Sequence, residues 1–196
     1  MNRRFFMSAH DELLQLIAKE RQARIRQRPE EIMECYFEDA VIVTSWMKGG
    51  LKEYAGGGKV PPMDPECPMV SRISLPVIHI DGDRAYAEVP AATIRYCYVN
   101  GVKAVLEYFM RHMYKFECRD GKWGIIDFRA IYESDRIQPE VPGQDLGIKP
   151  EDVNGFRHAY RFLSYIDKGT DQELPGIDRP QVVREMYNAY EEWLHA

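Results

Sequence analysis

The residues best suited to chemistry in this chain of 196 residues are one histidine and several tyrosines in a run of apolar segments. Tyr108 and His112 fall on one face of a predicted strand, because successive side chains of a strand point to opposite faces. A histidine in a dry pocket can act as general acid or base, since its unperturbed pKa is about 6.5. A core histidine with a satisfied hydrogen bond is the alternative.

Two more tyrosines, Tyr96 and Tyr132, lie in other predicted strands. A buried tyrosine hydroxyl needs a hydrogen-bond partner, and in a pocket it can donate to a substrate oxygen or polarise a carbonyl. Ordinary packing, with the hydroxyl at the rim, is the alternative interpretation. Together with His112 and Tyr108, these residues are the candidate catalytic groups.

Candidate ligand-binding residues are aromatic or cationic. The aromatic candidates, which could grip a flat apolar ligand, are Tyr36, Trp46, Tyr54 and Phe128. Arg129 lies two residues from Asp127, which favours an ion pair on an outer or dimer face; the alternative is an anchor for an anionic or phenolic ligand. Either Arg129 or Arg111 would stabilise an oxyanion if it faced inward, although Arg111 is predicted to face away from His112.

The composition gives no indication of a metal, a cofactor, a nucleic acid or a membrane. The four cysteines (Cys35, Cys67, Cys97 and Cys118) are scattered without metal-ligand spacing. The net charge of -5 has no long single-sign runs, which argues against a nucleic-acid partner. No stretch approaches the roughly 20 apolar residues of a membrane span, and no long apolar region marks a signal peptide. We expect a soluble cytoplasmic protein with free thiols that binds a small apolar or aromatic molecule.

The stretch 120–135 organises the elements that must position these residues. Asp120-Gly121 and Asn100-Gly101 are hairpin turn signals, and apolar or β-branched runs flank both. The sequence predicts strands over residues 40–46, 70–80, 84–98, 102–117 and 123–132. Along the last strand the even positions are apolar and end in Tyr132, whereas the odd positions carry Asp127 and Arg129.

Helical patterns lie at both ends of the chain. Apolar residues at helical spacing predict helices over residues 9–27 and 30–36, and later over 151–167 and 180–194. A glycine- and proline-rich loop spans residues 47–69, and a similar link spans 139–150. A loop of that first length is typical of a lid or another functional segment, and sometimes of disorder.

The segments YFEDAVI, SLPVIHIDGDRAYAEV and KFECRDGKWGIIDFRAIYESD stand in an order and spacing that resembles the SnoaL-like branch of the nuclear transport factor 2-like superfamily. The resemblance covers about residues 8–137. It implies an α+β fold in which a cone-shaped, strongly curved antiparallel sheet wraps around N-terminal helices and encloses a deep apolar pocket. We therefore expect a cone domain over residues 1–137 and a C-terminal helical pair over 138–196, packed on or beside it. Homodimers are common in the superfamily.

Members of this superfamily include dehydratases, isomerases, cyclases and lyases, and also non-catalytic binding domains, so the fold does not fix the function. The dehydratases use a Tyr and an Asp of the first helix and a His after the long loop. This chain has Glu20, Arg24 and Arg28 in that helix, and Ser71 or Arg72 in place of the His. Our leading hypothesis is a cofactor-independent lyase or isomerase that transfers protons on a small hydrophobic, aromatic or polycyclic substrate. The alternative is a non-catalytic ligand-binding or dimerisation domain.

Overall fold

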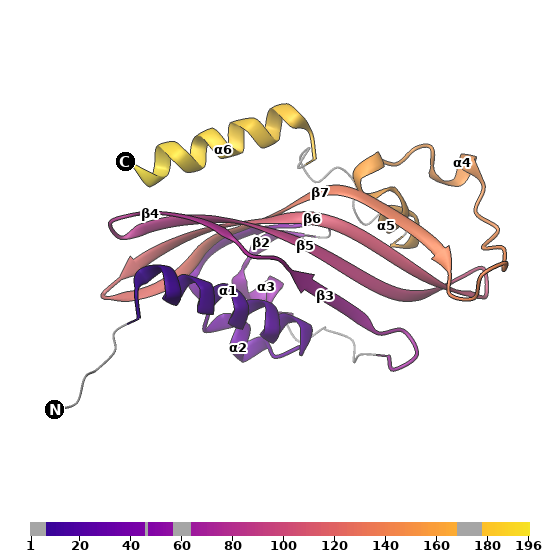
Figure 1. Ribbon diagram of the computed structural model, residues 1–196, viewed down its shortest axis with the longest axis horizontal. Helices are drawn as coiled ribbons and strands as arrows, with labels where there is room; N and C mark the ends of the chain where they lie inside the picture. The colour runs from indigo at the N-terminus through magenta and orange to yellow at the C-terminus, as the bar shows by residue number, and fades with distance from the viewer. Residues whose placement is uncertain (1–6, 46, 57–63, 168–177) are drawn as a thin grey trace.

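A curved seven-stranded sheet forms the centre of the protein in the computed structural model, which describes residues 7–45, 47–56, 64–167 and 178–196. The strand order is β2-β1-β7-β6-β5-β3, and β4 also pairs with β5. The strands are β1 (Tyr36–Val43), β2 (Lys48–Gly50), β3 (Met69–Ile73), β4 (Val77–Asp81), β5 (Arg84–Val99), β6 (Val102–Arg119) and β7 (Lys122–Pro139). The sheet curves without closing into a barrel (Figure 1).

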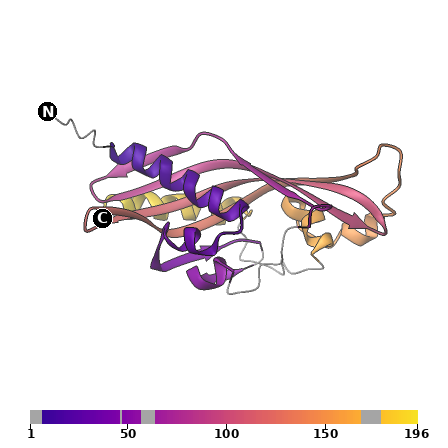
Figure 2. The same ribbon diagram turned by 90° about the horizontal axis from the view of Figure 1, so that it is seen from below.

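Helices cover both faces of this sheet. They are α1 (Ala9–Ile25), α2 (Pro29–Met33), α3 (Leu51–Tyr54), α4 (Pro150–Val153), the 3-10 helix η1 (His158–Tyr160), α5 (Arg161–Ile166) and α6 (Pro180–Leu194). The three N-terminal helices lie on one face, which we call the inner face, and α6 lies on the opposite, outer face (Figures 1 and 2). The predicted α+β class, with a curved sheet around N-terminal helices, is confirmed.

The helix cap and the hairpin turns that were predicted from the sequence are present in the structure. Ser8 caps α1 by accepting a hydrogen bond from the backbone N–H of Asp11 at 3.2 Å. The β5–β6 turn has φ of 49° at Asn100 and 81° at Gly101, as a two-residue hairpin turn of the I′ type requires. The β6–β7 turn at Asp120-Gly121 is of the same kind, with φ of 52° and 76°.

The sheet differs from the expected one in three respects. It is mixed, because β1 runs parallel to β7. The expected strand over 70–80 is two strands: β3 pairs with one half of β5 and β4 with the other, and Pro76 lies between them. Proline has no N–H for a sheet ladder, which explains the break. The last strand extends to Pro139, because the long strand β6 supplies pairing partners beyond Tyr132.

Two β-bulges in β7 decide which side chains share a face. The register against β6 shifts between Ile125 and Asp127 and again between Tyr132 and Ser134. The first bulge interrupts the predicted alternation, so Ile125 joins Phe128 in one core cluster. Between the bulges the alternation is as predicted.

The helical regions are confirmed at α1 and α6 but differ elsewhere. The expected helix over 30–36 ends at Met33, and Tyr36 begins β1 instead. The expected helix over 151–167 is divided into α4, η1 and α5. Gly155 lies at the first of these breaks, and a helix interior disfavours glycine. None of the helices in the described residues has both the length and the apolar composition that crossing a bilayer requires.

Candidate functional site

A cavity of about 210 Å³ lies between the inner face of the sheet and the C-terminal half of α1. Strands β5, β6 and β7 form its wall, and Leu163 and Asp167 of the α5 region border it at one end. Predicted site residues that line it are Tyr54, Tyr108, His112, Phe128 and Tyr132. A larger, open groove of about 970 Å³ lies along another face of α1, but it contains none of the predicted site residues.

His112 lies on β6 in the wall of this cavity and is only 3% exposed. Its ring contacts Phe128 edge-on, with 5.2 Å between the ring centroids. Its Nδ1 is buried and has no hydrogen-bond partner among the residues that the structure describes. Burial, with a smaller effect from the nearby positive charge of Arg21, holds the pKa of His112 well below its usual value of 6.5. The imidazole is therefore neutral at neutral pH, and a neutral imidazole has one ring nitrogen that can accept a proton.

Arg21 places a positive charge beside the Phe128 ring that His112 contacts. Its guanidinium carbon lies 4.9 Å from the centroid of Phe128. Its Nε and Nη2 both donate to the carboxylate of Glu20, and Nη2 also donates to the Tyr54 hydroxyl at 2.6 Å. This ion pair is almost wholly buried, because Glu20 is 0% and Arg21 9% exposed.

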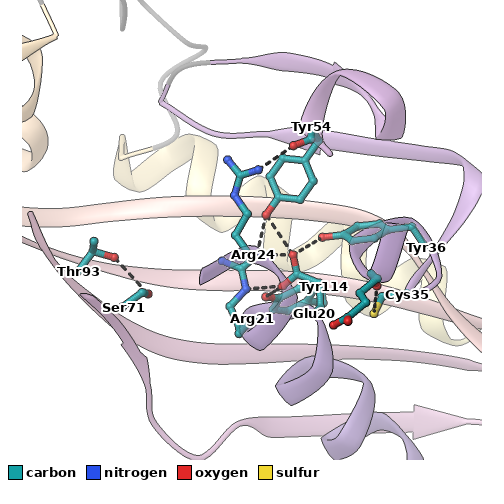
Figure 3. Close-up of polar contacts among 10 residues, drawn as sticks. Glu20, Arg21, Arg24, Cys35, Tyr36, Tyr54, Ser71, Thr93 and Tyr114 are labelled. Carbon is teal, nitrogen blue, oxygen red and sulfur yellow. Dashed lines mark hydrogen bonds and ion pairs between the residues drawn. The ribbon is translucent and has the colours of Figure 1, made fainter. Parts of the chain in front are cut away.

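Three tyrosine hydroxyls complete the environment of Glu20, as Figure 3 shows. Tyr36 and Tyr54 each donate to Glu20 Oε1 at 3.1 Å, and Tyr114 donates to Oε2 at 3.2 Å. Burial raises the pKa of Tyr54 to about 12 and raises the pKa of Tyr36 well above its usual value. The hydroxyls therefore stay protonated and act as donors, and the carboxylate fixes the orientation of Arg21. We call Glu20, Arg21, Tyr36, Tyr54 and Tyr114 the Glu20 cluster.

Two further hydroxyls lie in the cavity wall. The Tyr132 hydroxyl donates to Ser45 Oγ at 2.7 Å and accepts from the Ser45 backbone N–H at 3.3 Å. The Tyr108 hydroxyl has a weak contact with Met69 Sδ at 3.8 Å. Burial raises the pKa of both tyrosines, so both hydroxyls stay protonated in the cavity wall that also includes His112.

The structure does not bring Tyr96, Arg111 or Arg129 to this cavity. Arg129 pairs with Asp127 at 2.9 Å beneath α6, and this is the outer-face ion pair favoured by the sequence. Arg111 also lies on the outer face, where it donates to the Tyr187 hydroxyl at 2.8 Å. The hypothesis that one of these arginines faces inward is therefore wrong. Tyr96 of β5 also lies on the outer face of the sheet, beside Lys103.

Trp46, a predicted ligand-binding residue, lies outside the described residues, and so do residues 57–63 of the glycine-rich loop. Within the described residues no group of His, Cys, Asp and Glu side chains has the arrangement of a metal site. The four cysteines are free thiols.

The sequence interpretation missed the role of Arg21 and Glu20. Both follow Ile17 by three or four positions, which places them on the buried face of α1 with Leu13. Charged residues in an apolar stripe are the signal that indicates a buried ion pair. What the sequence could not supply was the set of partners, because Tyr36, Tyr54 and Tyr114 come from three distant segments.

Known proteins were found that resemble this chain in sequence or in fold. No family model matches the chain. An uncharacterised protein of Emericella nidulans is 28% identical over 163 residues, covering 76% of this chain and 68% of its own length.

Three solved structures have similar folds at low sequence identity. A type 2 hexachlorocyclohexane dehydrochlorinase (LinA) matches at 14% identity and a TM-score of 0.55, over 71% of this chain and 95% of its own. A candidate scytalone dehydratase of Novosphingobium aromaticivorans matches at 12% identity and a TM-score of 0.52, over 69% of this chain and 94% of its own. An NTF2-like protein of Cytophaga hutchinsonii matches at 16% identity and a TM-score of 0.50, over 63% of this chain and 98% of its own. The chain therefore has the fold of the nuclear transport factor 2-like superfamily.

Proposed function

We propose that the protein is a cofactor-independent lyase or isomerase that removes a carbon-bound proton from a small substrate, with His112 as the base. The observation that carries the proposal is the buried, unprotonated His112, whose Nδ1 has no partner in the described part of the chain and which lines a cavity. An unsatisfied buried nitrogen costs stability. A ligand group that forms a hydrogen bond with this nitrogen would relieve that cost.

The neighbours of His112 suit the charge that such a reaction develops. When a C–H beside a carbonyl gives its proton to the unprotonated ring nitrogen of His112, the electron pair moves onto the carbonyl oxygen as an enolate. The guanidinium of Arg21, oriented by Glu20, is the positive group placed to stabilise this oxygen. Reprotonation at another carbon completes an isomerisation. Loss of a leaving group from the β-carbon, protonated by a tyrosine such as Tyr132, completes an elimination instead.

Two structural neighbours support the elimination. The names of LinA and of the candidate scytalone dehydratase denote removal of HCl and of water, respectively. Both reactions are eliminations. Since the sequence identities are 14% and 12%, the neighbours support a class of reaction and no particular substrate.

The size of the cavity narrows the proposed substrate. At about 210 Å³ it exceeds the roughly 150 Å³ cavity that holds benzene in an engineered protein, and it falls below the roughly 300–1,000 Å³ of drug-sized sites. This volume favours a molecule with one ring over the polycyclic substrates also considered from the sequence.

A non-catalytic ligand-binding domain is the second candidate. The observation that favours it is the same unpartnered Nδ1, because catalytic histidines are usually oriented by a hydrogen bond to a second group. The two candidates differ in one respect: a binding domain would hold the ligand without exchanging its protons.

Deuterium exchange distinguishes the two functions. Methyl phenylpyruvate, a neutral one-ring ketone with acidic protons at C3, would be incubated with the protein in D2O, and loss of the C3 signal followed by proton NMR. We expect exchange that His112→Phe slows by about 100-fold or more and that the matched surface variant His10→Gln leaves unchanged. Binding of the ketone without protein-dependent exchange would instead support the binding domain.

A further inference from the structure

The pairing of β3 with β5 brings two of the four cysteines opposite each other. The two strands pair in an antiparallel register. The backbone N–H of Tyr96 donates to the Pro68 carbonyl at 3.0 Å, which continues this register one residue before the start of β3. The next position in the same register places Cys67 opposite Cys97, and both are free thiols in the structure.

The hydrogen bond at Pro68 determines how close the two cysteines lie. In an antiparallel ladder, hydrogen-bonded pairs alternate with non-hydrogen-bonded pairs, whose Cα atoms are about 4.5 Å apart and whose side chains lie closer together. Since Pro68 and Tyr96 are a hydrogen-bonded pair, Cys67 and Cys97 occupy a non-hydrogen-bonded position. That separation falls within the range of about 4.4–6.8 Å that a disulfide spans between Cα atoms.

Another pair in the same ladder shows how this position arranges side chains. Ser71 and Thr93 are also opposite each other at a non-hydrogen-bonded position, and their hydroxyl oxygens lie 3.2 Å apart (Figure 3). These oxygens occupy the place that sulfur has in a cysteine side chain. Burial chiefly raises the pKa of Cys97, and a smaller contribution comes from Cys67, as expected for two neighbouring thiols.

We propose that Cys67 and Cys97 form a disulfide when hydrogen peroxide oxidises the folded protein. Cys67 is partly exposed, whereas Cys97 is 8% exposed, so the first attack comes from Cys67. Its thiolate attacks one peroxide oxygen: the O–O bond breaks, an S–O bond forms and hydroxide leaves, which gives a sulfenic acid. The Cys97 thiol then attacks this sulfur: the S–S bond replaces the S–O bond, and the hydroxyl leaves as water with the thiol proton. The protein loses two electrons, and the peroxide is reduced to water.

The disulfide holds the start of β3 at the rim of the cavity. Met69 and Ser71 of this strand line the cavity, and β3 is a strand of five residues at the end of the sheet order. A covalent link between residues 67 and 97 removes conformations from the unfolded chain and thereby stabilises the folded one. The proposal is independent of the proposed function, because it uses neither His112 nor a substrate.

Peptide mapping tests the link. The full chain, freed of reductant, is treated with hydrogen peroxide at pH 8, its remaining thiols are alkylated in urea, and the tryptic peptides are identified by mass spectrometry. The pH is alkaline because burial raises the pKa of both thiols and the thiolate is the reactive form. We expect peptides 60–72 and 96–103, which contain Cys67 and Cys97, to be joined and two hydrogens lighter. Cys35 and Cys118 should be alkylated.

Two single substitutions separate this link from general oxidation. Cys67→Ser removes one partner and should abolish the joined peptide. Cys118→Ser removes another partly exposed cysteine, which lies opposite Trp123, and should leave the joined peptide unchanged. Oxidation should raise the thermal midpoint of wild type by about 5 °C or more, and dithiothreitol should reverse this rise. Cys67→Ser should show no such rise.

The same treatment of the protein unfolded in urea is the control for the oxidant. Disulfides in the unfolded chain, together with reduced Cys67 and Cys97 in the folded chain, would overturn the inference. A folded protein whose disulfides join other cysteines or separate chains would do the same. Oxygen adducts on Cys67 without the joined peptide would show that Cys97 cannot reach it. None of these results bears on deuterium exchange at His112, so the proposed function stands or fails separately.

Discussion

At the scale of single residues, the protein holds two groups that proteins rarely bury. One is the ion pair of Glu20 and Arg21, and the other is His112 with an unpartnered Nδ1. The ion pair is satisfied by Tyr36, Tyr54 and Tyr114, whereas the histidine is unsatisfied among the described residues. The ion pair has hydrogen-bond partners, whereas His112 Nδ1 has none among the described residues. This contrast marks His112 as the candidate for chemistry.

The Glu20 cluster should depend on its carboxylate. Glu20→Gln leaves the buried guanidinium of Arg21 without its countercharge, and we expect a loss of about 3–5 kcal/mol in the free energy of unfolding. Urea denaturation followed by circular dichroism measures this loss. Glu34→Gln, which breaks the exposed pair with Lys19, should have a much smaller effect. Comparable losses in the two variants would contradict the account of the cluster.

The buried histidine should make stability sensitive to acid. The unfolded chain takes up a proton on His112 near pH 6.5, whereas the folded chain does so only at a lower pH, so protons favour the unfolded state in that window. The free energy of unfolding of wild type, relative to His112→Phe, should therefore fall as pH decreases below 6.5 and be constant above it.

Denaturation midpoints at pH 7.5, 6.5 and 5.5 give this difference, and His10→Gln, an exposed position, is the control. We also expect His112→Phe to be no less stable than wild type at pH 7.5, because it removes an unsatisfied buried nitrogen. A marked loss of stability at that pH would indicate a structural histidine.

At the scale of elements, the sequence predicted what local chemistry decides. The two Asx-Gly turns, the capped helix α1 and the helix α6 follow from short-range signals, and the structure has all of them. The bulges at Ile126 and Glu133 and the parallel β1–β7 pair depend on contacts between distant segments. The sequence favoured outer-face positions for Arg129 and Arg111, which the structure has, but it could not supply the contact of Arg111 with Tyr187 of α6, which lies far away in the sequence.

The link between β7 and α5 depends on Asp135. Its carboxylate accepts a hydrogen bond from the backbone N–H of Leu163 at 2.7 Å and so caps the start of α5, which borders the cavity. Asp135→Ala should cost about 1–2 kcal/mol in the free energy of unfolding, measured by urea denaturation. Arg136→Ala breaks an exposed contact with Glu107 and should have little effect. An equal effect of the two changes would reject the capping role.

At the scale of the whole molecule, the C-terminal segment contacts the sheet on both faces. Residues of α5 border the inner cavity, whereas α6 covers the outer face, where the Tyr190 hydroxyl donates to Asp127 and the Tyr187 hydroxyl donates to Glu88. We infer that residues 138–196 do not form an independent folding unit. The expected homodimer remains a prediction.

This arrangement predicts one cooperative unfolding transition. Far-UV circular dichroism reports mainly on the sheet and helices together, and tryptophan fluorescence reports on Trp193 in α6 together with Trp123 in β7 and Trp46. The two signals should give coincident urea transitions with a single midpoint. An early fluorescence transition that leaves the sheet signal intact would show that the C-terminal segment unfolds separately.

The central claim is that His112 takes a proton from carbon inside the cavity. The most direct measurement is the rate of deuterium incorporation at C3 of methyl phenylpyruvate by wild type and by His112→Phe at equal protein concentration. The account predicts a ratio of about 100 or more between the two rates. Equal rates for the two proteins, with the ketone shown to bind both, would contradict it.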